Sequence, residues 1–319
     1  MSNRRKKNTR PAPRTSGYRD PKPAAAPAGK KGILDSLFAP RVPGSTSMPR
    51  VRTAITRGVV TVLGSPVLVI APILYVLLVW FLLIAAGYQG PFAPLASLLA
   101  LPPIGTSLDA SLATSLFGLQ GGLFGIIAFL AVRAIALALL SAAVVEALED
   151  GHVTRACLRR GLRALPVTFA ICIIGVGILT VSSFFGPLLG PGFGILLQVG
   201  ALVLGLYLFA FAPIIAVDEG RTMPDSLGRS VRAARIPGAG NLMLAALYVV
   251  PSIAVIVAPG KPGNLFGVNP SIAAWVFVLV INMLHVALLA TFAFRYLSVA
   301  HEVPDAPARQ PATAGRGRR

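Results

Sequence analysis

Residues 217–235, VDEGRTMPDSLGRSVRAAR, directly follow a long apolar run and mark where the chain leaves a hydrophobic environment. Two acids and a glycine arrive together, and arginines follow at positions 221, 229, 232 and 235. Gly220 supplies the positive φ that commonly ends a helix. Thr222 and Asp225 resemble a capping box, with Pro224 tolerated in the first turn. The stretch predicts a membrane-length helix that ends at Gly220 and a short amphipathic helix after it.

The composition is that of a membrane protein rather than of a soluble domain. Of the 319 residues, 55% are hydrophobic and only 13% are charged, and the mean hydropathy is +0.75. Long apolar runs separated by short charged blocks are typical of transmembrane segments. Six such runs lie at about 58–87, 122–148, 166–185, 193–217, 239–258 and 271–299.

Each of these runs is long enough to cross a hydrocarbon layer of ~30 Å as a helix. Backbone polar groups in lipid must be satisfied within the segment, which favours helices, and no run alternates as barrel strands would. The expected fold class is therefore all-α. We expect a polytopic membrane protein with six transmembrane helices in residues 58–300.

The two ends of the chain differ from this membrane domain. Residues 1–57 contain eight prolines and 14 Lys and Arg against two acids, which accounts for +12 of the net charge of +18. Such segments bury too little apolar surface to become ordered, so residues 1–57 and 301–319 are predicted to be disordered cytoplasmic tails. Anionic lipids, a nucleic acid and a partner protein are the alternatives for what the basic tail binds. Lipids are favoured over nucleic acid, because Tyr18 and Phe38 are the tail's only aromatic residues for base stacking.

The basic residues also predict the orientation. Four segments are basic, with 14, four, four and four Lys and Arg: 1–57, 149–164, 218–238 and the tail after 299. The intervening loops carry Lys261 alone: 88–121, 186–192 and 259–270. By the positive-inside rule both termini lie in the cytoplasm. Arginine outnumbers lysine 23 to 6, which indicates a GC-rich bacterial genome, so we expect a bacterial plasma membrane.

Residues 149–164 and 218–233 align without a gap, which indicates an internal repeat. The predicted repeat units, near 122–185 and 193–258, are helical hairpins with a short interfacial helix on the cytoplasmic side. On a helical wheel the apolar and charged residues of each short helix occupy opposite faces; the apolar ones are Leu158, Leu162 and Leu165 in the first copy and Leu227, Val231 and Ala234 in the second. Arginines on the charged faces are expected to contact anionic lipid headgroups: Arg160, Arg163, Arg229 and Arg232.

Residues 212–235, APIIAVDEGRTMPDSLGRSVRAAR, resemble a segment shared by several bacterial families of six-helix integral membrane proteins. The matching positions are Pro213, Asp218 or Glu219, Gly220, Arg229 and Ser230. Val231 departs from the pattern, because the families often have an aromatic residue there. These families include the membrane domain of some glycerophosphoryl diester phosphodiesterases and many members without assigned activity. The resemblance implies a fold and no activity, because the phosphodiesterase chemistry belongs to a separate domain without counterpart in these 319 residues.

Arg133 is expected near mid-depth of the second span, where a charge costs roughly 2.5–3.5 kcal/mol on insertion scales. We expect no acid inside a span, and hence no intramembrane carboxylate partner for Arg133. Two interpretations are open: a site for an anionic ligand or lipid phosphate, and a structural residue that bonds helix-end carbonyls or reaches the interface. Asn282 and His285 share a face of the sixth span at the same depth, and Gln198 lies shallower on the fourth. If spans two, four and six adjoin, these four residues form a ligand-binding cluster; the alternative is ordinary interhelical hydrogen bonding.

No catalytic site is expected. The sequence contains no Walker A, H-E-x-x-H, G-x-S-x-G or Cys-x-x-Cys motif. We therefore predict no catalytic residues, metal or cofactor. The expected function is that of a non-enzymatic envelope or lipid-associated accessory or scaffold protein, with anionic membrane lipids and a membrane protein as partners. The alternative is a small permease or lipid-handling transporter in which Arg133 contacts an anionic group.

Overall fold

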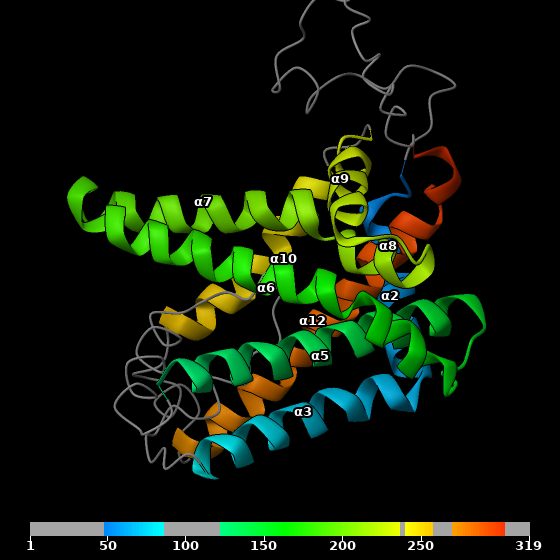
Figure 1. Cartoon of the computed structure of the whole chain (residues 1–319), viewed down its shortest axis with the longest axis horizontal. Coiled ribbons are helices and arrows are strands. Elements are labelled where there is room, and N and C mark those ends of the chain that lie inside the picture. Colours follow the sequence, from blue (N-terminus) through cyan, green and yellow to red (C-terminus); the bar gives the residue numbers. More distant parts are fainter. Residues whose placement is uncertain (1–47, 86–121, 237–239, 258–269, 304–319) are drawn as a thin grey trace, which may run out of the picture.

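The computed structural model describes residues 48–85, 122–236, 240–257 and 270–303, and every element in these ranges is a helix (Figure 1). In chain order the elements are α2 (Val51–Gly64), α3 (Pro66–Ala85), α5 (Gly122–Glu149), α6 (Ala156–Leu189), α7 (Pro191–Phe209), α8 (Ala212–Asp218), α9 (Met223–Ala234), α10 (Gly240–Val257), α12 (Pro270–Leu297) and the 3-10 turn η2 (Ala300–Glu302). Residues 1–47 and 304–319, which carry most of the two predicted tails, lie outside the described residues. Residues 51–57, assigned to the basic tail by composition, form the first turns of α2.

Four helical segments are long and apolar enough to cross a membrane: Ile127–Glu149, Ala156–Ile178, Val199–Asp218 and Trp275–Leu297. A fifth is added if α2 and α3 count together as one bent span. Gly240–Val249, within α10, is apolar but shorter. The prediction of an all-helical, multi-pass membrane protein is confirmed, and the number of six spans stays a prediction.

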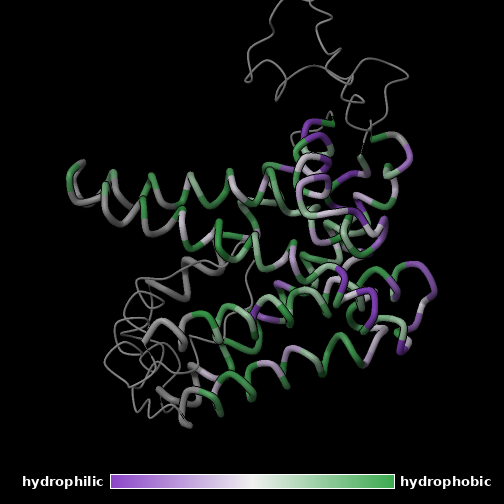
Figure 2. The backbone as a smooth tube through the Cα atoms, viewed as in Figure 1, coloured by the Kyte–Doolittle hydropathy of each residue, from purple (hydrophilic) through white to green (hydrophobic). Residues whose placement is uncertain are grey.

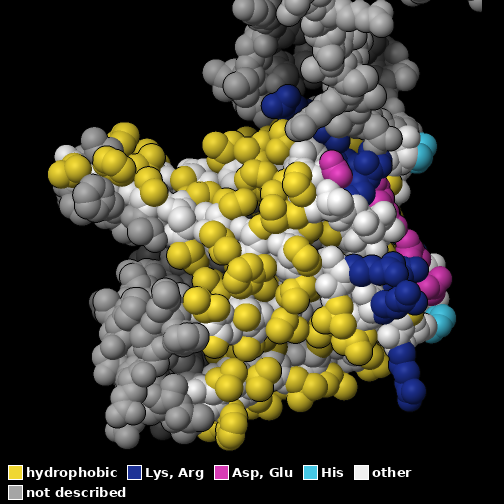
Figure 3. Space-filling view, viewed as in Figure 1, with side chains coloured by type: hydrophobic (Ala, Val, Ile, Leu, Met, Phe, Trp, Pro, Cys, Tyr) yellow, Lys and Arg dark blue, Asp and Glu magenta, His cyan; other side chains and the backbone are white. Residues whose placement is uncertain are grey.

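Charged side chains gather at one end of the long helices. In Figure 1, α3, α6 and α10 lead away from the end where α9 lies, and α5, α7 and α12 lead back to it. Figure 2 shows hydrophobic residues along these helices, and Figure 3 shows Lys, Arg, Asp, Glu and His side chains along that end of the face in view. We call it the charged end and define it by residues 150–155, α9 and residues 298–303. Leu188 and Leu196, far from it, are 73% and 67% exposed, as a lipid-facing surface requires.

The first apolar run, 58–87, is not one straight helix as predicted. The helices α2 and α3 meet at an angle of 80°. Ser65 between them has an extended backbone, which the following Pro66 favours, and Pro66 then opens α3. The result is that α2 lies close against the C-terminal half of α12.

Small residues allow the close approach of α2 to α12. Ala54, Gly58 and Val62, spaced four apart, are the buried residues of α2. A methyl group built at Gly58 would lie 2.6 Å from the carbonyl oxygen of Ala287 and 2.9 Å from the backbone nitrogen of Thr291. Contact at this range is the helix packing that small residues permit in membranes.

The predicted separate interfacial helix after the second span is also wrong, because residues 156–165 are continuous with the third span in α6. The second short helix, α9, is separate from α10 as expected. The sequence explains the difference, since both continuations contain a proline but only the one after α9, IPGAG, has two glycines, whereas LPVTFA in the first copy has none.

The fourth apolar run, 193–217, is divided into α7 and α8 at residues 210–211. Residues Ala212–Val217 of α8 are all buried, and α8 packs against α5, α6 and α9. This short helix is thus the core of the charged end. It places the acidic pair there, with Asp218 as its last residue and Glu219 directly after it.

Candidate functional site at the charged end

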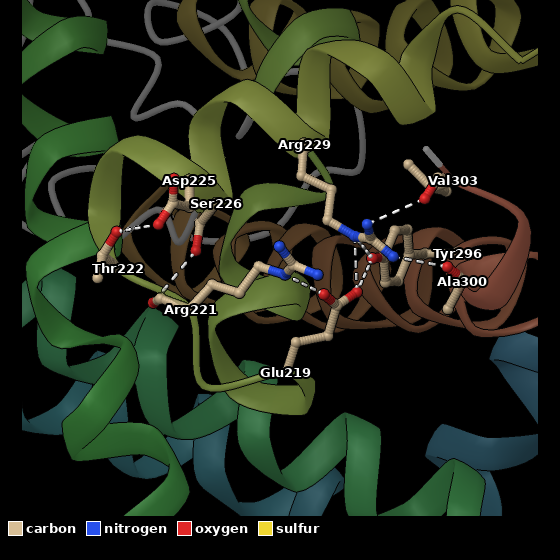
Figure 4. Close-up of polar contacts among 9 residues, drawn as sticks. All are labelled: Glu219, Arg221, Thr222, Asp225, Ser226, Arg229, Tyr296, Ala300 and Val303. Carbon is tan, nitrogen blue, oxygen red and sulfur yellow. Dashed lines mark hydrogen bonds and ion pairs between the residues drawn. The ribbon is translucent and has the colours of Figure 1, made fainter. Parts of the chain in front are cut away.

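Glu219 is the centre of a polar cluster that joins three helices (Figure 4). It follows α8 directly and is succeeded by Gly220, whose φ of 63° turns the chain back toward α9. The left-handed region favours glycine, so the helix end predicted at this position is confirmed. Thr222 is the N-cap of α9, as expected, but its hydroxyl donates to the carboxylate of Asp225 at 2.6 Å rather than capping a backbone N–H.

The Glu219 carboxylate accepts hydrogen bonds from three side chains. Arg229 Nε lies 2.9 Å from Glu219 Oε1. The Tyr296 hydroxyl also donates to Oε1, and Arg221 Nε donates to Oε2. Charge-assisted bonds of this kind are stronger than neutral ones, so these contacts fix the position of the Glu219 side chain, and both of its oxygens have a donor.

Arg229 distributes its donors over the C-terminal segment. Its Nε also donates to the Tyr296 hydroxyl at 2.9 Å, while Nη1 donates to the Val303 carbonyl at 3.0 Å and Nη2 to the Ala300 carbonyl at 2.7 Å. Burial alone would lower the pKa of the guanidinium, but Tyr296 and Glu219 outweigh it, so the pKa is raised and Arg229 stays charged. We define the Arg229 clamp as the side chains of Glu219, Arg229 and Tyr296 with the backbone carbonyls of Ala300 and Val303. It fastens α9 and residues 300–303 to α12.

Three neutral hydrogen bonds hold α9 against the end of α7 and the start of α10. The Ser230 hydroxyl donates to the Leu208 carbonyl at 2.7 Å, which ties α9 to α7. The Tyr207 hydroxyl donates to the Ala234 carbonyl at 2.8 Å, and Asn241 Nδ2 reaches the same oxygen at 3.4 Å. The last turn of α9 is therefore satisfied from both α7 and α10.

The expected lipid contact of Arg229 is corrected by this geometry. The residue is 5% exposed and its guanidinium is bound inside the protein. The helical wheel failed because α9 packs through small residues, Ser226, Ser230, Ala233 and Ala234, and Arg229 lies on that same buried face. Arg232 is partly exposed. Tyr296 is fully buried in the clamp.

Glu146 is a buried acid that the sequence analysis missed. It lies in α5 within the predicted second span, so the expectation of no acid inside a span is wrong. Its carboxylate is 1% exposed and accepts from the Thr154 backbone N–H at 2.9 Å and the Thr154 hydroxyl at 3.1 Å. Glu146 lies thirteen residues after Arg133, about 20 Å along the helix, so the two do not pair. The sequence does show Glu146 as a single acidic residue within an apolar run.

Arg160 forms an ion pair with the preceding acidic segment. Its Nη1 lies 2.9 Å from Glu149 Oε2, and its Nε is 3.9 Å from Glu146 Oε1. The Arg160 side chain is 39% exposed, so it is also accessible from outside. The predicted lipid contact of Arg160 and of Arg163, which is exposed, stays a prediction.

The helical-wheel assignment for the first copy is corrected as well. Leu158 and Leu162 are more than half exposed. They share one face of α6 with Arg155, Arg159 and Arg163. The buried face consists of Cys157, Gly161 and Ala164 instead. A methyl group at Gly161 would lie 3.1 Å from the Leu139 Cα, so α6 packs on α5 through its smallest residues.

The second candidate site is the cluster of polar residues predicted inside the membrane domain. Arg133, Asn282 and His285 are each at most 1% exposed, so all three point into the protein. Their helices, α5 and α12, pack against each other and both run toward the charged end. The Arg133 guanidinium lies 5.7 Å from the centre of the Phe129 ring, and His285 stacks on Tyr248 at 4.7 Å. The outward-reaching alternative for Arg133 is therefore wrong.

The grouping of Gln198 with these residues stays a prediction, because its side chain is outside the described residues. Its helix, α7, packs mainly on α6 and α10. A second buried arginine that the sequence analysis missed, Arg295 in α12, lies against the backbone of Gly240 at the start of α10.

Four acids of the described ranges accept hydrogen bonds from arginine, threonine or tyrosine side chains: Glu146, Glu149, Glu219 and Asp225. No group of three or more His, Cys, Asp or Glu in the described ranges is placed to hold a metal ion. Cys157 and Cys172 are free and buried. Comparisons of the chain with protein-family models, with curated proteins and with solved structures give no match.

Proposed function

We propose that this chain is a six-span protein of a bacterial plasma membrane, with both termini in the cytoplasm, that serves as a non-enzymatic, lipid-associated accessory or scaffold. The observation that carries the proposal is the charged end. Both ends of the described chain, at residues 48 and 303, and both basic loops lie there. Positive charge marks the cytoplasmic side, and the apolar remainder fits lipid.

Matching contacts at an offset of 69 residues support the internal repeat. Gly151 and Gly220 match, and they have φ values of 75° and 63°. The matched arginines, Arg160 and Arg229, each bond one acid of the pair before the glycine, although Glu149 matches Asp218 and not Glu219.

Packing follows the same offset. Gly161 approaches Leu139 in the first copy, and the matched Ser230 bonds the matched Leu208 in the second. The matched alanines, Ala164 and Ala233, are both fully buried. Two hairpins built on one plan account for this correspondence.

The motif residues that carry the resemblance to six-helix bacterial families favour a structural role. Glu219 and Arg229 bond each other, and Arg229 also donates to two backbone carbonyls. Gly220 makes the turn, and the Ser230 hydroxyl ties α9 to α7. Their bonding capacity is used within the chain, which is the behaviour of a scaffold motif rather than of a substrate site.

Extraction of the full chain in native nanodiscs, followed by mass spectrometry of lipids and proteins, tests this proposal. We expect anionic phospholipids enriched over the bulk membrane and one membrane protein retained reproducibly. Recovery of bulk lipid composition with no retained protein would contradict it. A mock extraction of an unrelated six-span protein from the same membranes supplies the control.

A permease or lipid-handling transporter is the second candidate, favoured by the burial of Arg133 and Asn282 at similar depth on adjoining helices. They lie about 24 and 22 Å from the C-terminal ends of α5 and α12 at 1.5 Å per residue. Under the scaffold proposal, Arg133→Leu leaves the retained lipids and small molecules unchanged. Loss of one anionic lipid or metabolite from Arg133→Leu alone would favour the permease.

A further inference from the structure

Three arginines form an unpaired row at the start of α6. Arg155, Arg159 and Arg163 are spaced four residues apart, so they lie one above another on a single helix face. All three are exposed, and within the described residues none makes a hydrogen bond or ion pair with the protein. Like charges at this spacing destabilise a helix. The row therefore lacks the internal compensation found elsewhere at the charged end.

Two carboxylates near the row are bonded to other groups. Glu149 is paired with Arg160, and Glu146 accepts from Thr154. The contrast with Arg229, whose donors are bonded inside the chain, shows that this protein does satisfy arginines where they serve its own structure. The three unpaired arginines present their charge outward instead.

Leucines lie between the arginines and complete an amphipathic groove. Leu158 and Leu162 are 57% and 53% exposed and, with the three arginines, line an open groove of about 400 Å³. The groove is open rather than enclosed, so it suits one side of an extended molecule. Guanidinium groups beside exposed leucines match a molecule that carries both a phosphate and an acyl chain.

We infer that this groove, lined by Arg155, Leu158, Arg159, Leu162 and Arg163, binds the headgroup of an anionic phospholipid. The phosphate contacts the arginines and the acyl chain runs along the leucines into the bilayer. The groove lies on the first turns of α6, before its apolar length, which is the level of lipid phosphates in the proposed orientation. The inference rests on the proposed function and adds to it the class of ligand and the residues that bind it.

The test compares two triple variants that remove equal charge from the same end of the molecule. The groove variant is Arg155→Gln, Arg159→Gln and Arg163→Gln. The control is Arg50→Gln, Arg52→Gln and Arg57→Gln, whose arginines are exposed around α2. Each full chain is equilibrated in detergent with equimolar phosphatidylglycerol and phosphatidylcholine of identical acyl chains, and the lipids retained are counted by native mass spectrometry.

We expect the wild type and the control to prefer phosphatidylglycerol, and the groove variant to lose at least about tenfold in affinity for it. The expectation follows because each arginine near anionic lipid contributes a factor of about five. Replacing the three arginines by lysine keeps the charge and should retain most of the preference. Protection of the two buried cysteines from a thiol reagent confirms that each variant is folded.

Each other outcome overturns something specific. Equal losses in the groove and control variants would mean diffuse attraction, which removes the groove and leaves the proposed lipid association standing. A wild type without preference for phosphatidylglycerol would overturn the lipid-associated function itself. Displacement of the bound lipid by millimolar inorganic phosphate would make the ligand free phosphate rather than a lipid. A co-purified acidic protein that leaves only the groove variant, with no lipid preference, would also overturn the inference.

Discussion

Arg229 on α9 donates a hydrogen bond of 2.9 Å to the hydroxyl of Tyr296 on α12, a residue 67 positions later in the chain. The same nitrogen contacts Glu219, and the rest of the guanidinium bonds the carbonyls of residues 300 and 303. One side chain thereby joins the second predicted hairpin to the end of the last long helix. The position of the C-terminal segment depends on a residue that sequence alone would assign to the lipid interface.

Removal of the Arg229 guanidinium should destabilise the protein strongly. We expect Arg229→Gln to cost about 2–4 kcal/mol, because Glu219 loses one of its three donors and the carbonyls of Ala300 and Val303 lose the guanidinium. Thermal unfolding can be followed in detergent by the reaction of the buried Cys157 and Cys172 with a thiol-reactive dye. The control removes an exposed arginine outside the clamp, Arg52→Gln in α2, and should change stability by less than about 1 kcal/mol.

The pairing with Glu219 is tested by a double-mutant cycle. Glu219→Gln and Arg229→Gln should be strongly non-additive, with a coupling of about 1–3 kcal/mol, because both remove the same ion pair. Additive effects would show that Arg229 stabilises the protein through packing alone.

Replacing glycine by alanine at two positions of α2 should change stability in opposite directions, because only Gly58 lies against α12. Gly58→Ala should destabilise by about 1–3 kcal/mol, because its methyl group meets backbone atoms of Ala287 and Thr291. Gly64→Ala meets nothing within 4 Å and should stabilise by roughly 0.5–1 kcal/mol, as a helical glycine replaced by alanine does. The same thiol-reactivity unfolding assay measures both, and a loss at both positions would refute the packing explanation.

Gly220 is required for its backbone angle and not for space. Gly220→Ala meets nothing within 4 Å but must adopt a φ of 63°, which should cost about 1–2 kcal/mol. Gly220→Asn should recover much of that stability, because asparagine tolerates the left-handed region. Gly177→Ala, also free of contacts and inside α6, is the control and should not destabilise. If alanine and asparagine behave alike at position 220, backbone strain is not the cause.

The orientation is tested with cysteines placed on the two sides. Met223→Cys and His301→Cys lie exposed at the charged end, whereas Lys261 lies in a loop expected outside. In spheroplasts, a membrane-impermeant maleimide should label Lys261→Cys and reach the other two only after permeabilisation. The buried native cysteines give little background. Labelling of Met223→Cys before permeabilisation would invert the proposed topology.

The sequence by itself determined the elements and where several of them end. Apolar length predicted the membrane helices, because backbone in lipid must bond within each segment. The acid-acid-Gly pairs predicted turns that the structure places at Gly151 and Gly220, because a positive φ is a local property of the chain. Clustering of basic residues predicted which loops share one end of the molecule, and they do.

Only the tertiary structure decided what the polar residues contact. Arg229, Arg159 and Arg163 look alike in the sequence, as arginines of short basic helices, yet the first is bonded inside the protein and the other two are unpaired outside. The reason is that helices at the charged end pack through their smallest residues, such as Gly161 and Ser230, rather than through leucines. Which face is buried therefore depends on how closely a neighbouring helix approaches, and a helical wheel carries no information about the neighbour.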